Sequence, residues 1–150
     1  MWFIAGSFGG TVARTCHVPA GKGIFFPLIN TECSNVEPDP FLCTTPEECA
    51  ECNDVFFGDS DKLSVTIDGT DLGNLHNYRP QSTMLTEFTT PPADDILGIP
   101  GVTGLSGADG YWIMLAPLSK GEHTIHWEAT LGGGPFAGFS QDNTYTIIVD

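Results

Sequence analysis

The segment Leu63-Ser64-Val65-Thr66-Ile67 alternates apolar and polar side chains. Successive side chains of a β-strand point to opposite faces of its sheet, so this alternation predicts a strand with one buried face and one solvated face. Antiparallel sheets commonly have one face in water, whereas parallel sheets are covered on both faces. The segment therefore favours an antiparallel sheet that packs on a core through one face.

Similar short segments recur along the chain. The 18 glycines and 11 prolines separate runs of β-branched and aromatic residues, which is typical of many short strands. The predicted strands cover residues 2–5, 11–18, 23–29, 62–68, 84–88, 110–115, 123–131 and 143–149. We therefore expect an all-β fold, an antiparallel β-sandwich of the jelly-roll or immunoglobulin-like type.

The apolar members of these segments predict the core. Their side chains alternate with polar ones, so they share one face of each strand. They are Ile4, Ile24, Phe26, Leu28, Val65, Ile67, Ile113, Leu115, Ile125, Trp127, Tyr145 and Ile147.

Two turn-like segments join consecutive predicted strands. Pro19 and Gly21 lie in the first, and Pro117 and Gly121 lie in the second. Because Pro and Gly supply the backbone angles of a chain reversal, we expect a β-hairpin at each segment.

Two stretches interrupt the strand pattern. Apolar periodicity is lost over residues 35–54 and over residues 91–107, as is typical of long surface loops. We therefore expect a single domain, residues 1–150, with two long irregular loops. The first loop forms a Cys-rich insert near residues 35–57.

The insert contains the one short helix that the sequence predicts. Thr45 can cap its N-terminus, Pro46 suits the first helical position, and Glu48 can close a capping box.

Acidic residues dominate the charge of the chain. Its 150 residues include 5 Lys and Arg against 19 Asp and Glu, a formal net charge of −14. So few cations cannot form the basic face that phosphate backbones require, so we expect neither nucleic acids nor anionic membranes as partners. No apolar run approaches the roughly 20 residues of a transmembrane helix.

Five strings carry a resemblance to a known group of proteins. In order they are WFIAGSFGG, RTCHVPAGKGIFFPLINTECS, VTIDGTDLGNLHNYRPQS, DGYWIMLAPLSKGEHTIHW and FSQDNTYTIIV. They resemble a widespread group of secreted bacterial proteins of unknown function, generally pictured as β-sandwiches. The resemblance implies a β-sandwich and a secreted, extracellular or periplasmic location, and it implies no reaction. Members of the group usually begin with a signal peptide, which this chain does not contain, so we expect that segment upstream of Met1.

Five cysteines lie within the first 52 residues. Such clustering is typical of disulfides in an oxidising compartment. The expected hairpin would bring Cys16 beside Cys33, so we predict a bond between them. Cys43 can then bond with Cys49 or Cys52, which leaves one thiol.

Metal binding is the second interpretation of these cysteines. Cys49 and Cys52 have the two-residue gap of a zinc knuckle, and Cys33, Cys43 or His17 could complete the ligand set. A strong zinc pattern needs two such pairs, and this chain has one. A redox Cys-x-x-Cys ranks third, because it normally follows a strand in a βαβ unit.

Ser7 lies in the string Ala5-Gly6-Ser7-Phe8-Gly9, which has the shape of a hydrolase nucleophile elbow. An elbow continues into a helix, and a strand-like run follows here. A glycine-rich bend between strands is therefore the favoured interpretation.

Trp112, His126 and Glu128 are the candidate ligand-binding residues. If Ile113, Ile125 and Trp127 face the core, then these three side chains face outward. An aromatic ring beside an imidazole and a carboxylate could bind a sugar by stacking and hydrogen bonding. A solvated cross-strand pair on the sheet surface is the favoured interpretation of the same pattern.

Four aspartates near strand ends are the candidate metal ligands: Asp59, Asp61, Asp68 and Asp71. Calcium prefers six to eight oxygen ligands from loops of this kind. The spacing does not match an EF-hand, so Ca²⁺ is a hypothesis and no other cofactor is expected.

Three functions fit these patterns. The first is an extracellular module that binds a ligand, a glycan or an envelope component, through a sheet face or loop ends. The second is a secreted hydrolase of ester or glycoside bonds with its site in residues 35–54 or 91–109, although no nucleophile, base and orienting group are recognisable together. The third is a structural domain of a larger surface protein.

Overall fold

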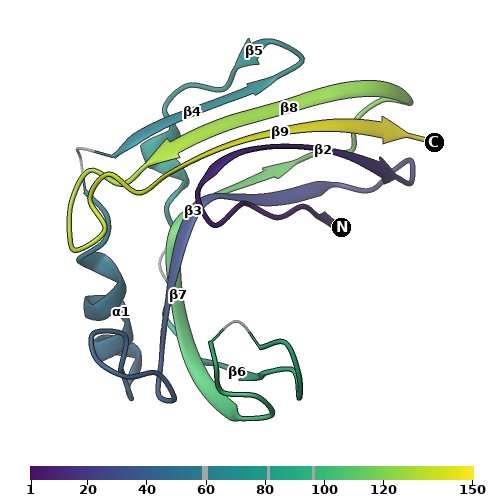
Figure 1. Cartoon of the computed structure of the whole chain (residues 1–150). Helices are drawn as coiled ribbons and strands as arrows, with labels where there is room; N and C mark the ends of the chain where they lie inside the picture. Colours follow the sequence, from purple (N-terminus) through teal and green to yellow (C-terminus); the bar gives the residue numbers. More distant parts are fainter. Residues whose placement is uncertain (59–60, 81, 96) are drawn as a thin grey trace.

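The computed structural model describes residues 1–58, 61–80, 82–95 and 97–150. Its strands form two sheets packed on each other, with one helix beside them (Figure 1). The four-stranded sheet has the order β1 (Trp2–Phe3), β3 (Ile24–Ser34), β7 (Thr103–Leu115), β6 (Thr86–Thr89). The five-stranded sheet has the order β2 (Gly10–Val18), β9 (Ser140–Val149), β8 (Gly121–Thr130), β4 (Lys62–Ile67), β5 (Thr70–Asp71). The predicted all-β sandwich is confirmed.

Each of the eight predicted strands corresponds to an observed one, and the sequence missed only the two-residue β5. The main differences are in length, because β3 continues to Ser34 and β7 begins at Thr103. These extensions carry both strands beyond the edge of the five-stranded sheet (Figure 1). Part of the second predicted loop, residues 91–107, is therefore strand, whereas the first, residues 35–54, begins directly after β3 and contains α1.

The predicted hairpins are wrong. β2 lies in the five-stranded sheet and β3 in the four-stranded one. Likewise, β7 lies in the four-stranded sheet and β8 in the five-stranded one. The connecting segments therefore cross from one sheet to the other. Pro and Gly allow the chain to reverse, but they do not determine which strand the next one pairs with.

Two strand pairs are parallel, which corrects the expectation of purely antiparallel sheets. β1 pairs with β3, and β2 pairs with β9 from Gly10 opposite Gln141 to Val18 opposite Val149. Parallel pairs need long connections, and the β2–β9 pair joins segments from opposite ends of the chain.

Aromatic side chains join the sheets at the centre of the core. Trp127 of β8 packs against Phe26 of β3 with 4.9 Å between ring centroids, and Tyr145 of β9 stacks on Trp127 at 5.6 Å. All the predicted core residues are buried except Ile67 and Leu115, which are half-buried. These two are the last residues of β4 and β7, where the sheets stop covering each other.

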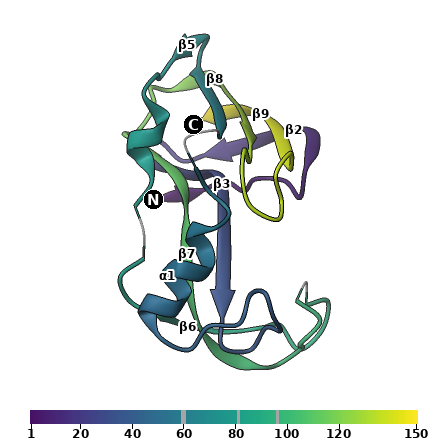
Figure 2. The ribbon, with the colours of Figure 1, turned by 90° about the vertical axis from the view of Figure 1, so that its left-hand side faces the viewer.

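The helix α1 (Pro46–Asp54) packs beside the five-stranded sheet on the same face of β3 and β7 (Figures 1 and 2). Its capping box is present as predicted, because Thr45 Oγ1 accepts a hydrogen bond from the Glu48 amide and Glu48 Oε2 accepts one from the Thr45 amide. A short 3₁₀ helix, η1 (Leu75–Tyr78), lies against β7. Among the described residues, no helix is long and apolar enough to span a membrane.

One disulfide fixes the insert to the sheet, and a second one closes a loop within the insert. Cys33 of β3 bonds Cys52 of α1, and Cys43 bonds Cys49 in the first half of α1. The predicted Cys16–Cys33 bond is wrong, and Cys16 is a free thiol. The prediction failed because it rested on a β2–β3 hairpin, whereas these strands belong to different sheets.

The disulfide pattern gives a direct test of the fold. Non-reducing peptide mapping should recover Cys33 joined to Cys52 and Cys43 joined to Cys49, with Cys16 alkylated without reduction. Replacing both Cys33 and Cys52 with Ser should lower the free energy of unfolding by about 3 kcal/mol, the chain-entropy value for a loop of this size. A peptide containing Cys16 bonded to Cys33 would contradict the strand arrangement.

Candidate functional site

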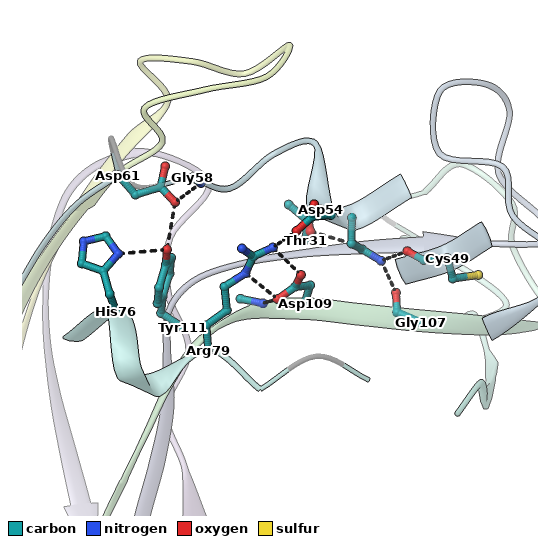
Figure 3. A network of polar contacts seen from close by, with 12 residues as sticks. Thr31, Cys49, Asp54, Gly58, Asp61, His76, Arg79, Gly107, Asp109 and Tyr111 are labelled. Atoms are coloured by element: carbon teal, nitrogen blue, oxygen red, sulfur yellow. Dashed lines mark hydrogen bonds and ion pairs between the residues drawn. The ribbon is translucent and has the colours of Figure 1, made fainter. Parts of the chain in front are cut away.

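An ion-pair network holds α1 and the segment after η1 against β7 (Figure 3). Arg79 donates two hydrogen bonds to Asp109, Nε to Oδ1 at 3.0 Å and Nη2 to Oδ2 at 2.7 Å. Nη2 also pairs with Asp54 at 2.8 Å, and the guanidinium lies 4.7 Å from the centre of the Phe57 ring. The Asp109 side chain is 2% exposed, so its charge depends on Arg79 for compensation.

Tyr111 forms the second half of the network. Its hydroxyl donates to Asp61 Oδ2 at 3.1 Å and lies 3.3 Å from His76 Nδ1. Burial, with Asp61 adding to the effect, raises the pKa of Tyr111 to about 12, so the phenol stays protonated as a hydrogen-bond donor. Asp61 also accepts hydrogen bonds from the Gly58 and Gly132 amides. The network therefore joins several loops to β7, and we infer that its role is structural.

Replacing Asp109 tests this role. Asp109→Ala should lower the free energy of unfolding by about 3–5 kcal/mol, because Arg79 loses its buried partner. Asp54→Ala removes a carboxylate that is 63% exposed and should cost within about 1 kcal/mol. Equal effects of the two variants in denaturant unfolding would contradict the buried pair as the anchor.

The structure does not bring the predicted calcium ligands together. Asp61 is buried in the network, Asp68 accepts hydrogen bonds from the Thr124 amide and pairs with His123 Nδ1 at 2.6 Å, and Asp71 accepts from the Gly73 amide. The hydrogen bond with His123 lowers the pKa of Asp68. Asp59 lies outside the described residues. None of the other three belongs to a cluster of three candidate ligands in the described part of the chain.

Trp112 is also separated from His126 and Glu128. It lies on β7, in the four-stranded sheet, where it stacks on Phe25 with 5.5 Å between ring centroids. His126 and Glu128 lie on β8, in the other sheet. The expected outward orientation is correct for all three side chains, since their strand neighbours Ile113, Ile125 and Trp127 are buried. The expected proximity rested on a β7–β8 hairpin that does not form.

Glu32 and Glu37 form a hydrogen-bonded carboxyl pair, which no pattern in the sequence predicts. Ser34 Oγ donates to Glu37 Oε2 at 2.8 Å. Burial raises the pKa of Glu32 to about 7, and the hydrogen bond and the charge of Glu37 add to this rise. At mildly acidic pH the folded protein therefore holds a proton on Glu32.

The raised pKa of Glu32 predicts how stability depends on pH. The folded pKa of Glu32 lies above its ordinary value of 4.5, so the folded state binds more protons than the unfolded state between these values. The free energy of unfolding should therefore fall as pH rises from about 5 through about 7. Glu32→Gln should flatten this slope, whereas Glu87→Gln, at an exposed position on β6, should leave it unchanged. A wild-type slope that survives in Glu32→Gln would contradict the assignment.

The connections β1–β2 and β8–β9 meet at one end of the sandwich, and both line the Phe8–Phe139 hollow. It consists of two adjoining cavities of about 330 and 300 Å³ that share Phe8, Asn30 and Phe139 as lining residues. Phe8 is 88% exposed. Its ring is therefore open to contact from a ligand in the hollow.

Polar groups line one side of the Phe8–Phe139 hollow. Gln141 Oε1 accepts hydrogen bonds from the Ser7 amide at 3.1 Å and from Asn143 Nδ2 at 3.0 Å. A side chain at position 6 would place its Cβ 2.7 Å from Gln141 Oε1, so it would displace the Gln141 amide from its present position. Ser7 Oγ is buried and has no hydrogen-bond partner among the described residues.

Ser7 lacks the surroundings of a catalytic nucleophile. The chain after it enters β2 and not a helix. Among the described residues, the polar contacts of the four histidines are with the carboxylates Asp68, Glu128, Asp142 and Asp150, and with Ser119 and Tyr111. The bend between strands, which the sequence favoured, is what the structure has at this position.

Comparison with known proteins adds little to this description. No family model matches the chain, and no curated protein matches it. The solved structures that resemble it include the cysteine protease inhibitor EhICP2 from Entamoeba histolytica, at 12% identity over 99% of this chain and 95% of that one, with a TM-score of 0.35. PbICP-C in complex with falcipain-2 has 9% identity over the whole of both chains and a TM-score of 0.37. Amebosin has 13% identity over 99% and 97% of the two chains and a TM-score of 0.29. Likeness at this level carries no argument about function.

Proposed function

We propose that this chain is an extracellular binding module without catalytic activity, and that the Phe8–Phe139 hollow binds a neutral carbohydrate. The observation that carries the proposal is the combination of exposed aromatic rings with an unpaired buried hydroxyl in one hollow. Binding sites for small molecules are concave, mostly apolar and equipped with a few convergent polar groups.

The lining chemistry favours a sugar over other small molecules. Sugar rings have apolar C–H faces, which pack on aromatic rings such as Phe8 and Phe139. Their hydroxyls both donate and accept hydrogen bonds, so they can pair with Ser7 Oγ and with the side-chain amides of Asn30 and Gln141. The described residues that line the hollow include no ionisable side chain, so a neutral ligand is favoured over a charged one.

Two observations support an extracellular location. The two disulfides are of the kind that persists in oxidising compartments. The resemblance to secreted bacterial β-sandwich proteins agrees with them. The net charge of −14 also favours neutral partners over nucleic acids and anionic lipids.

A glycan array followed by titration calorimetry tests the proposal. The wild-type protein should bind a neutral glycan, and Phe8→Ala should weaken that binding about tenfold, since loss of one aromatic contact costs about 1.4 kcal/mol. Phe3→Ala is the matched control, because Phe3 is 69% exposed on the outer face of the four-stranded sheet. It should bind as the wild type does.

Two other outcomes would contradict the proposal. Binding that is lost in Trp112→Ala and retained in Phe8→Ala would move the site to the face of the four-stranded sheet. Turnover of an ester or glycoside by the purified protein would favour the hydrolase hypothesis. Absence of binding across the array would refute a neutral carbohydrate as the ligand.

A further inference from the structure

We propose that His126, Glu128 and Asp142 form a binding site for a zinc-class divalent metal ion on the solvent face of the five-stranded sheet. This site is separate from the Phe8–Phe139 hollow and does not depend on the function proposed for it.

The three donor atoms are close enough to share one ion. His126 Nε2 lies 2.9 Å from Asp142 Oδ1 and 3.9 Å from Glu128 Oε1, and the ligand atoms of the three residues all lie within 4.8 Å of one another. Two donors that each lie about 2.1 Å from an ion, at the tetrahedral angle, are about 3.4 Å apart. The observed distances lie on either side of this value, so small side-chain rotations suffice to close the site.

Strand pairing fixes the positions of the three ligands. His126 and Glu128 are two residues apart on β8, so they face the same side of the sheet. Glu128 lies directly opposite Asp142 of β9, and His126 lies opposite Thr144. The neighbouring inward residues Ile125 and Trp127 are fully buried, which prevents a slip of register that would turn the ligands inward.

The donor set indicates the class of metal. Imidazole nitrogen with carboxylate oxygens suits zinc and similar transition metals, whereas calcium takes six to eight oxygen ligands. Three protein ligands leave at least one position of a tetrahedral ion open. In the described part of the chain, no Lys or Arg forms an ion pair with Glu128 or Asp142, so both carboxylates are free to bind a cation.

The surroundings orient one ligand and leave room for solvent. Thr11 Oγ1 donates a hydrogen bond to Asp142 Oδ2 at 3.4 Å, which leaves Oδ1 directed at His126. Hydrogen bonds from residues that do not themselves bind the ion orient the metal ligands. A solvent-open hollow of about 210 Å³, lined by Thr11, Glu128 and Asp142 among others, lies beside the site. The open metal position can therefore hold water or a small external ligand.

Calorimetric titration of the full chain with ZnCl₂, after EDTA treatment and at about 0.15 M salt to screen diffuse attraction, tests the site. We expect one zinc ion per chain. His126→Ala and Asp142→Ala should each weaken binding about tenfold or more, because even loss of an outer contact costs about 10- to 100-fold. CaCl₂ should bind more weakly than ZnCl₂. Circular dichroism of the metal-free variants should match the wild type, since all three side chains are at least partly exposed.

His17→Ala and Cys16→Ser are the control variants, because an exposed histidine beside a free thiol is the other obvious place for zinc. Both should bind zinc as the wild type does. Zinc binding that is lost in these controls, or that survives in His126→Ala, would overturn the proposal, as would the absence of stoichiometric binding. Phe8→Ala should keep the zinc affinity, so failure of the carbohydrate proposal and failure of this one are distinguishable.

Discussion

The contact on which the structure depends is the packing of Trp127 between Phe26 and Tyr145. It joins the two sheets at the centre of the core, and Trp127 is fully buried. Its indole Nε1 has no hydrogen-bond partner among the described residues, so the ring is held by apolar packing that outweighs the cost of an unpaired donor. Fixing Trp127 inward also fixes its neighbours on β8 outward, and this is what places His126 and Glu128 on the solvent face beside Asp142.

The parallel pair β2–β9 determines where the two candidate sites lie. Because β2 starts beside the start of β9, the connections that lead into these strands meet at the same end of the sandwich. Phe8 and Phe139 come from these connections, 131 residues apart in sequence, and they share one hollow. The first residues of β9 separate the two candidate sites. Gln141 points inward to the hollow, whereas Asp142 points outward, on the same side as His126 and Glu128.

Local patterns in the sequence were reliable guides to local structure. Side-chain alternation predicted the strands, and ten of the twelve core residues predicted from it are buried. Thr45 and Glu48 predicted the start of α1. Both signals depend on neighbours within a few residues. Pairing between distant segments was not predictable in this way. Cys16 and Cys33, and likewise Trp112 and His126, were expected to meet through hairpins, but each pair is divided between the two sheets. For the same reason nothing in the sequence linked Phe8 with Phe139, or Asp142 with His126.

The Cys-rich insert has a structural effect on the candidate binding end of the molecule. Its helix is fixed to β3 by the Cys33–Cys52 bond and to β7 through Arg79 and Asp109. The insert then contributes Phe41, and the segment after α1 contributes Phe56. Both rings stack on Phe136 of the β8–β9 connection, at 5.9 and 5.4 Å between centroids. Because Phe136 also lines the Phe8–Phe139 hollow, one wall of that hollow is held in place by the insert. A segment that reads as an irregular acidic loop thus forms part of the support of the binding surface.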